Sequence, residues 1–278
     1  MKVGFIGYGL LGKIIFKKFF LFNKDIKIYN RTSKKISSIE NKNKVGNSNN
    51  IFEENELIFL ILYDDKSLLD VLKKIHNSKL KGKIVVNLTT ISYKTSKYLS
   101  NKFKGTSTVW IDAPIMGSLE AAKKNELIFL YSGKKINLAI KYLKLIGSII
   151  FYNQNSASQF LKLCHNSVCT MIMIAMGEIF FLSKKHKIKK KLVLEMIANS
   201  AFYSPLISAK IQKYRNDDFR PSFTYFNMMK DLKYMQSLSK KSGFLINKTF
   251  DIFKAKYKDK YKNKDTSYIS KLIENEKI

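Results

Sequence analysis

The chain has 278 residues, of which 45% are apolar and 13% aromatic, so it can bury a sizeable core and wholesale disorder is excluded. This length corresponds to one large domain or two modest ones. The 12 glycines and 3 prolines exclude a collagen-like or proline-rich architecture, and the two cysteines, Cys164 and Cys169, supply neither a disulfide framework nor a cysteine-based zinc site.

The formal net charge is +30, from 51 basic and 21 acidic residues. A field of this size attracts nucleic acid or an anionic membrane surface. However, the arginines are Arg31, Arg215 and Arg220 alone, whereas proteins that read nucleic-acid sequence rely on bidentate arginine contacts. Lysine accompanies an excess of Asn, Ile, Phe and Tyr. We therefore attribute the charge to mutational bias on solvated faces and do not expect a nucleic-acid partner.

Short β-rich runs alternate with amphipathic stretches over the first 152 residues. The pattern predicts strands at residues 2–6, 26–30, 57–62, 84–88, 109–112, 127–131 and 149–152. Helical spacing predicts helices at residues 10–22, 67–76, 92–101 and 136–146. This alternation indicates an α/β fold, a doubly wound and mostly parallel sheet with helices on both faces.

The remainder of the chain shows helical patterns and no evident strand, and its lysine-rich tail resembles a low-complexity segment. Helices are expected at residues 159–185, 190–200, 203–214, 224–241 and 246–262. Residues 168–182 are apolar nearly all round but too few for a clean membrane span, which favours a helix buried at a domain or subunit interface. We therefore expect two domains, residues 1–152 and an all-helical domain of residues 153–278, in a soluble cytoplasmic protein without a membrane segment.

The strongest local motif is a glycine loop directly after the first expected strand, formed by Gly7, Tyr8, Gly9, Leu10, Leu11 and Gly12. The first glycine permits a tight turn, the second lets the backbone approach a pyrophosphate, and the third allows close packing of helix on strand. The phosphates then lie at the helix N-terminus. Because a strand precedes the loop and a helix follows it, the motif predicts a dinucleotide cofactor.

The end of the second expected strand indicates which dinucleotide is bound. Enzymes selective for NAD place Asp or Glu there to bind the ribose hydroxyl, whereas this chain has Asn30, Arg31 and Thr32. A guanidinium and a hydroxyl can bind the 2′-phosphate that a carboxylate would repel. We therefore expect NADP(H) to be preferred, with NAD(H) possible. The alternative interpretation is a helix N-cap at Thr32 or Ser33 beside a surface arginine.

Taken together, four motifs resemble the β-hydroxyacid dehydrogenase family, which includes 3-hydroxyisobutyrate dehydrogenase and the glyoxylate/succinic semialdehyde reductases. They are the glycine loop, Asn30-Arg31-Thr32, Asp112-Ala113-Pro114-Ile115-Met116-Gly117-Ser118, and Lys162 with Asn166. Their order and spacing match over nearly the whole chain. The resemblance implies an N-terminal Rossmann domain and an all-α C-terminal domain, joined by a long helix that helps to form a dimer. We expect a homodimer or homotetramer.

Lys162 and Asn166 are the expected catalytic residues. Being four positions apart on a helix, they share one face. A lysine can donate a proton to a carbonyl oxygen as a hydride arrives, and Asn166 can hold the same oxygen or orient the lysine. On spacing alone Lys162 would be an ordinary surface lysine, and its catalytic role is implied by the resemblance.

The resemblance also implies that backbone N–H groups of Met116, Gly117 and Ser118 bind the substrate carboxylate. A Gly-Ser ending is more similar to the glyoxylate/succinic semialdehyde reductase branch, and Met116 departs from the serine that many members carry. Two further departures, Ser156 and Ser158, stand at positions that are often glycine. They would stiffen the loop or narrow the nicotinamide pocket.

Further cofactor contacts implied by the resemblance are Thr90, Leu62 and Tyr63, where Tyr63 replaces a proline. Late in the chain, Phe223 and Lys230-Asp231-Leu232 resemble a family segment whose lysine reaches toward cofactor and substrate. The alternative for Lys230 and Asp231 is an ordinary solvated pair, which contributes little.

These features predict an NADPH-dependent oxidoreductase that interconverts a small aldehyde acid and its hydroxyacid, with glyoxylate or succinic semialdehyde as the leading substrate. Alternatives are a 3-hydroxyisobutyrate- or tartronate-semialdehyde-type dehydrogenase and an imine reductase, although imine reductases commonly replace the catalytic lysine. From another class, the charge would suit a non-catalytic polyanion-binding protein. The scattered His76, His165 and His186 give no metal-ligand spacing, so no metal is expected.

Overall fold

The computed structural model describes residues 1–239 and 242–276, and the chain divides into two compact units, Met1–Leu163 and Cys164–Ile278. The strands of the first unit are β1 (Val3–Ile6), β2 (Lys27–Tyr29), β3 (Leu57–Leu60), β4 (Ile84–Asn87), β5 (Val109–Asp112), β6 (Ile115–Met116), β7 (Leu127–Ser132) and β8 (Gly147–Tyr152). Its helices are α1 (Leu10–Phe22), α2 (Ser48–Glu54), α3 (Asp65–Lys73), α4 (Asn77–Leu80), α5 (Tyr93–Phe103), α6 (Leu119–Lys124) and α7 (Asn137–Lys144).

The strands form one sheet of order β2-β1-β3-β4-β5-β7-β6, and β8 pairs with β7. From β2 to β5 all neighbours are parallel, whereas β7 is antiparallel to β5 and to β6. Since β1 has β2 on one side and β3 on the other, the direction of winding reverses at β1. Ligands of doubly wound sheets bind at such a reversal, outside the carboxyl ends of the strands.

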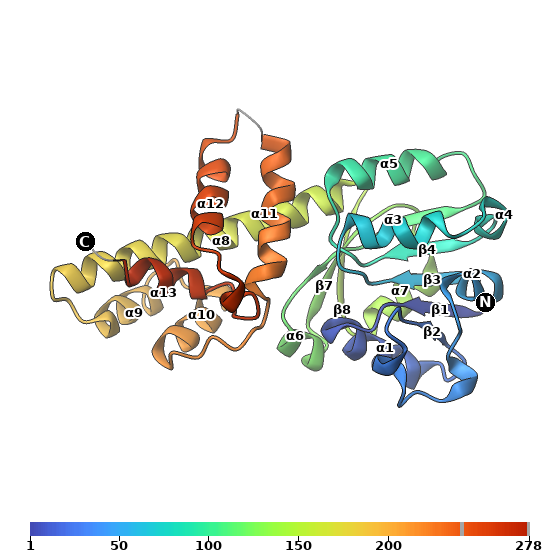
Figure 1. The fold of residues 1–278 in the computed structure, drawn as a ribbon, viewed down its shortest axis with the longest axis horizontal. Helices are drawn as coiled ribbons and strands as arrows, with labels where there is room; N and C mark the ends of the chain where they lie inside the picture. The colour runs from blue at the N-terminus through green and yellow to red at the C-terminus, as the bar shows by residue number, and fades with distance from the viewer. Residues whose placement is uncertain (240–241, 277–278) are drawn as a thin grey trace. The chain divides into compact units, whose positions relative to one another are not determined.

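Helices cover both faces of this sheet (Figure 1). One face packs on α1, α6 and α7, where side chains such as Phe16, Phe19 and Tyr142 are buried among Phe5 and Phe59 of the strands. The other face packs on α2, α3, α4 and α5. Burial on both faces explains why β1 and β3 are continuous apolar runs instead of alternating ones. The expected Rossmann fold is confirmed.

Helix α8 (Ala157–Lys185) begins in the first unit and continues into the second. The second unit adds α9 (Lys190–Ala198), α10 (Pro205–Arg215), α11 (Tyr225–Ser239), α12 (Phe244–Ala255) and α13 (Tyr268–Glu274). In its described part the β-type pairing is an isolated bridge between Thr224 and Asp265. The last two residues of the helix expected at 224–241 lie outside the described residues.

Two apolar clusters build the second unit around α8. One joins α8 to α11, α12 and α13, and the other joins α8 to α9 and α10. Gly177 allows α8 and α13 to pack closely, because a Cβ at this position would lie 2.8 Å from the Cα of Ser270 in α13. By length and composition α8 could also cross a membrane, but 56% of its most apolar window is buried inside the protein, as in the core helix of a soluble domain.

Several short elements differ from the sequence expectations. Helices α2, α4 and α6 and strand β6 were not expected, and the helix expected at residues 246–262 ends at Ala255. The lysine-rich tail is not a low-complexity extension, because α13 buries Ile269 and Ile273 against α8. The expected boundary at residue 152 lies five residues before α8, whereas the two compact units divide inside that helix.

Candidate active site

The three glycines of the glycine loop have three different surroundings. Gly7 has a φ of 109°, and a Cβ there would lie 2.0 Å from the carbonyl oxygen of Ile61 in the segment after β3. A Cβ on Gly12 would lie 2.6 Å from the Gly7 oxygen. At Gly9, by contrast, an added Cβ meets nothing within 4 Å. Gly7 and Gly12 are therefore required by the fold, whereas Gly9 leaves open space at the N-terminus of α1.

Asn30 ties this loop to the end of β2. Its side-chain oxygen accepts a hydrogen bond from the Tyr8 N–H at 2.8 Å, and its amide nitrogen donates to the Thr32 carbonyl at 2.9 Å. Asn30 thus shapes the backbone on which Arg31 and Thr32 stand, both exposed. The Thr32 side chain caps no helix in this structure, which leaves its hydroxyl and the Arg31 guanidinium open to an anionic ligand.

These residues fit a nicotinamide dinucleotide. Gly9 is the N-cap of α1 and no side chain caps this helix, so the N–H groups of its first turn face the open space beside Gly9. Arg31 is exposed two residues after β2, at the strand end where doubly wound folds bind the ribose of the dinucleotide. Further loops at this sheet edge follow β3, β4 and β5.

Thr89 links the loop after β4 to the loop after β3. Thr89 is buried, and its hydroxyl accepts a hydrogen bond from the Leu62 N–H at 2.8 Å. Thr90 is half-buried and Tyr63 is 40% exposed. The expected contacts Leu62, Tyr63 and Thr90 therefore lie at the same carboxyl edge as the glycine loop.

A buried polar network lies beneath this edge and centres on Asp112 at the end of β5. Its carboxylate accepts hydrogen bonds from Asn87 at 2.7 Å, Ser96 at 2.6 Å and Gln159 at 3.2 Å. Burial raises the pKa of Asp112 above its ordinary value, although the hydrogen bonds from Ser96 and Asn87 oppose that rise. Each group in this network is held in one orientation.

Residues 116–118, which are expected to bind the substrate carboxylate, run from the end of strand β6 to the start of helix α6. Met116 is the last residue of β6 and pairs with Ile128 of β7, so this end of the segment belongs to the sheet. The Ser118 hydroxyl caps α6 by accepting a hydrogen bond from the Ala121 N–H at 3.2 Å. Gly117 between them is exposed, with a φ of 128°.

Lys162 and Asn166 lie one turn apart on α8 and are 6% and 4% exposed. Burial of a lysine is unusual, and here it distinguishes Lys162 from the solvated lysines that give the chain its charge. The Asn166 amide donates a hydrogen bond of 2.6 Å to the carboxylate of Asp231 in α11. An amide held in this way presents its oxygen on its other side.

Lys230 and Asp231 form a largely buried ion pair, with 2.9 Å between the ammonium and the carboxylate and side-chain exposures of 13% and 1%. The interpretation as an ordinary solvated pair is therefore wrong. Asp231 was not among the expected site residues. Its place beside Lys230 in the Lys-Asp-Leu segment was the available signal, and its hydrogen bond to Asn166 was not visible in the sequence.

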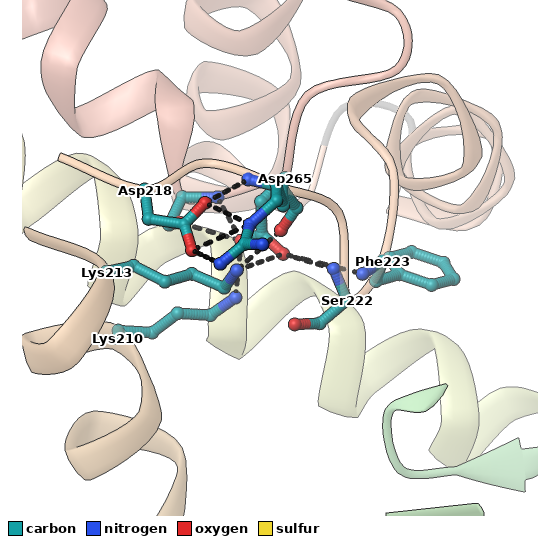
Figure 2. Close-up of polar contacts among 8 residues, drawn as sticks. Lys210, Lys213, Asp218, Ser222, Phe223 and Asp265 are labelled. Carbon is teal, nitrogen blue, oxygen red and sulfur yellow. Dashed lines mark hydrogen bonds and ion pairs between the residues drawn. The ribbon is translucent and has the colours of Figure 1, made fainter. Parts of the chain in front are cut away.

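A second buried carboxylate, Asp265, holds the segment that leads into α11 (Figure 2). It lies 2.7 Å from the ammonium of Lys210 and 3.8 Å from that of Lys213. It also accepts hydrogen bonds from the N–H groups of Ser222 and Phe223, at 2.8 and 3.5 Å. Phe223 and the start of α11 are thereby fixed from within the second unit.

The structure thus gathers the expected residues in two groups. The first unit holds the glycine loop, Asn30, Arg31, Thr32, Leu62, Tyr63, Thr90, Met116, Gly117, Ser118 and Lys162, and the second unit holds Asn166 and Lys230. Helix α8 carries one member of each group, Lys162 and Asn166. In the part of the chain that is described, no three His, Cys, Asp or Glu side chains gather as metal ligands.

A Rossmann sheet with an open glycine loop, followed by an all-helical unit, defines a nicotinamide-dinucleotide-dependent oxidoreductase. A family model described as the NAD binding domain of 6-phosphogluconate dehydrogenase matches residues 2–152. A second, described as the NAD-binding of NADP-dependent 3-hydroxyisobutyrate dehydrogenase, matches residues 156–273. The chain belongs to the β-hydroxyacid dehydrogenase family, whose members are NAD(P)-dependent dehydrogenases acting on CH–OH groups.

Individual proteins agree with this assignment. The Arabidopsis thaliana chloroplastic glyoxylate/succinic semialdehyde reductase 2 is 24% identical over 247 residues, which cover 86% of this chain and 69% of that protein. The structure of Mycobacterium tuberculosis 3-hydroxyisobutyrate dehydrogenase with L-serine has a TM-score of 0.87 at 18% identity, covering 97% and 98% of the two chains. That of Psf3 with NADP+ and 2-OPP has a TM-score of 0.84 at 17% identity, covering 98% and 99%.

Proposed function

We propose that this protein is a cytoplasmic NADPH-dependent reductase of small aldehyde acids, with glyoxylate or succinic semialdehyde as substrate. The observation that carries the proposal is the burial of Lys162 and Asn166 one turn apart on α8, in a chain whose other basic residues are mostly solvated. The relative named for glyoxylate and succinic semialdehyde supports the choice of substrate. Tartronate and methylmalonate semialdehyde are the alternatives within the class.

The glycine loop would hold the pyrophosphate, and Arg31 with Thr32 would bind the 2′-phosphate of NADPH. When bound, the cofactor supplies a hydride for the carbonyl carbon of the substrate. Thr90, Leu62 and Tyr63, at the same sheet edge, would contact its ribose and nicotinamide portion. We assign to Lys230 a contact with the cofactor or with the substrate.

Lys162 acts as the general acid. It donates a proton to the carbonyl oxygen as that oxygen gains negative charge, and in the reverse direction it accepts the proton from the hydroxyl group. Asn166 holds the same oxygen or orients Lys162, and Asp231 fixes the amide of Asn166 in one rotamer through the hydrogen bond of 2.6 Å. Asp231 therefore joins the proposed site as a positioning residue.

The substrate carboxylate would bind to backbone N–H groups of residues 116–118. Exposed Gly117, with its positive φ, lies between a strand end and the N-terminus of α6. Because the Ser118 hydroxyl already caps α6, we assign the binding to the backbone and not to that side chain. Any aldehyde acid short enough to span from this backbone to Lys162 would be accepted.

We also propose that the protein is a homodimer formed through α8. Val168, Ile172, Ala175, Ile179 and Leu182 lie on one side of the helix, and all are exposed or half-exposed. Their spacing of four, three, four and three residues is that of helices that pack against each other. A second copy of the same helix would cover this stripe.

The test is oxidation of NADPH, followed by absorbance, with glyoxylate, succinic semialdehyde, tartronate semialdehyde and a cyclic imine as separate substrates. We expect turnover of an aldehyde acid and none of the imine. In Lys162→Ala, kcat should fall by about 100-fold or more while the Kd of NADPH stays within about twofold, because a proton donor acts in the transition state. Lys184→Ala, at an exposed position of the same helix, is the matched control.

Turnover that persists in Lys162→Ala would contradict the assignment of the proton donor. Turnover of the imine alone would favour the imine reductase alternative. If NADPH binds and no substrate reacts, binding to heparin at increasing salt tests the polyanion alternative. That binding would weaken steeply with salt and would survive Lys162→Ala, since counterion release depends on many lysines together.

A further inference from the structure

The side chain of Gln159, in the first turn of α8, uses both ends of its amide. It is fully buried. Its oxygen accepts a hydrogen bond of 3.1 Å from the Ile91 N–H. Its nitrogen donates to the Thr89 carbonyl at 2.9 Å and to the Asp112 carboxylate at 3.2 Å. No other orientation of this amide satisfies the same donors and acceptors, because a flipped amide would direct N–H at N–H and oxygen at oxygen.

The partners of Gln159 are themselves held in place. Asp112 accepts hydrogen bonds from Asn87 and Ser96, and the Thr89 hydroxyl receives the Leu62 N–H. A continuous set of hydrogen bonds therefore joins the segments after β3 and β4 and the end of β5 to the start of α8. All of these groups belong to the first compact unit.

We propose that Gln159 is a positioning residue, which fixes Lys162 in register with the loop that carries Thr90. Lys162 lies three residues after Gln159, in the next turn of the same helix, so any rotation or axial shift of the first turn moves it. This inference rests on the proposed roles of Lys162 as proton donor and Thr90 as cofactor contact. It adds that their relative placement depends on one buried amide.

Two substitutions separate positioning from ordinary packing. Gln159→Met keeps a side chain of similar length but leaves the Ile91 N–H and the Thr89 carbonyl without this partner. Gln159→Glu keeps the acceptor for Ile91 and puts a carboxyl oxygen against Asp112, the titratable side chain that hydrogen-bonds to this position. A carboxyl buried beside another carboxylate has a raised pKa, so it is protonated and can act as a donor at mildly acidic pH. Gln154→Glu, exposed and five residues earlier, is the matched control.

The experiment measures kcat and KM for the aldehyde acid that the native protein reduces, between about pH 6 and about pH 8.5, well below each variant's melting temperature. In Gln159→Met we expect kcat to fall roughly 10- to 100-fold with KM within about threefold, as misplacement of a reacting group does. In Gln159→Glu we expect a similar loss at the alkaline end and recovery toward the native kcat at the acidic end. Gln154→Glu should match the native protein throughout.

The proposal is overturned if both variants keep the native kcat, or if Gln159→Glu lowers the melting temperature and shows no recovery of kcat at the acidic end. If the native protein reduces none of the aldehyde acids, the proposed function fails, and the Kd of NADPH decides the role of Gln159 instead. A rise in that Kd of about threefold or more in Gln159→Met supports positioning of the loop of residues 89–91. An unchanged Kd contradicts it.

Discussion

At the scale of single residues, Ser156 and Ser158 both stand where the family often has glycine, and the structure accommodates the two serines differently. Ser158 donates its N–H to the Ser132 hydroxyl at 3.0 Å and lies within the Asp112 network. Ser156 has a φ of 65°, a left-handed conformation that glycine adopts freely, and its buried hydroxyl has no hydrogen-bond partner among the described residues. Of these two serines, Ser156 is therefore the one that strains the backbone.

We predict that Ser156→Gly stabilises the protein. Relief of the left-handed backbone and removal of the unpaired hydroxyl together outweigh the entropy that glycine adds to the unfolded chain, by about 1 kcal/mol. Thermal unfolding should shift upward by about 2–4 °C. Ser156→Ala, which removes the hydroxyl and keeps the Cβ, should recover only part of this gain. A lower melting temperature in Ser156→Gly would show that the hydroxyl has a favourable contact.

The proposed role of Arg31 is to select NADPH over NADH. Replacing it with a carboxylate removes the cation expected at the 2′-phosphate and adds repulsion, so in Arg31→Asp the affinity for NADPH should fall roughly 10- to 100-fold. The affinity for NADH should stay within about threefold, because NADH has no 2′-phosphate. Fluorescence titration measures both, with Arg215→Asp, an exposed arginine of the second unit, as control. Equal losses for both cofactors would contradict a specific phosphate contact.

At the scale of elements, Asp265 fixes the segment between α10 and α11 (Figure 2). Burial alone would raise its pKa, but the ammonium of Lys210 and the hydrogen bonds from Lys210 and Ser267 lower the pKa below its ordinary value. The ionised carboxylate therefore stabilises the folded state at neutral pH. This contribution is lost as the pH falls below the ordinary aspartate pKa of about 3.9, through the lower pKa of the folded state.

We predict that Asp265→Asn lowers the free energy of unfolding by about 3 kcal/mol near pH 7, because two lysines lose their buried partner. The difference from the native protein should narrow at pH values below about 4, where the native carboxylate also becomes protonated. Urea unfolding of both proteins at a series of pH values measures this difference in the free energy of unfolding. Asp218→Asn, in the exposed pair with Arg220, should change the unfolding midpoint little. A constant difference at all pH values would contradict the ion-pair explanation.

Strands and long helices were predictable where apolar side chains alone determine the element. β1 and β3 are buried runs and α8 is a long apolar helix, so their patterns are strong. α13 was missed because its sequence is surrounded by lysines, and its two apolar residues, Ile269 and Ile273, are buried in a cluster with residues far away in the sequence, on α8, α11 and α12. Asparagine-rich α2 was missed for a related reason, since its helix depends on a local Asn47 cap and on packing against the sheet.

In the candidate site, the local motifs were predictable from the sequence and the long-range contacts were not. Gly7, Gly9 and Gly12 lie where the motif places them, because the motif is a local consequence of strand, turn and helix. The hydrogen bonds of Asn166 with Asp231 and of Gln159 with Thr89 join residues 65 and 70 positions apart. No local spacing carries such information, so these positioning residues became visible only in the structure.

At the scale of the whole molecule, the apolar stripe on α8 is the surface that we assign to a second copy of the chain. Val168 and Leu182, at its two ends, are 53% and 50% exposed. A repeating apolar stripe on a helix that is otherwise a core element is unfavourable in water unless it is covered. The proposed dimer would cover this stripe without any change in the fold.

We predict that Leu182→Glu weakens this dimer, because a carboxylate at the interface must be desolvated or exposed by separation of the subunits. Analytical ultracentrifugation should show a shift from dimer toward monomer at micromolar concentration. Leu245→Glu, at a 59% exposed position of α12, should leave the distribution unchanged. If the native protein is a monomer and instead floats with lipid vesicles, the stripe faces a membrane and the dimer is wrong.

The empty surroundings of Gly9 have a consequence for how such proteins change over evolutionary time. Gly7 and Gly12 are protected by the fold itself, since any side chain there collides with backbone or with the side chain of Ile61. Gly9 has no such protection, so a larger residue there would leave the domain folded and would fill the open space at the N-terminus of α1, where we propose that the dinucleotide binds. Among proteins that share this fold, the residue at this position would therefore separate those that can still bind a dinucleotide as proposed here from those that keep the fold alone.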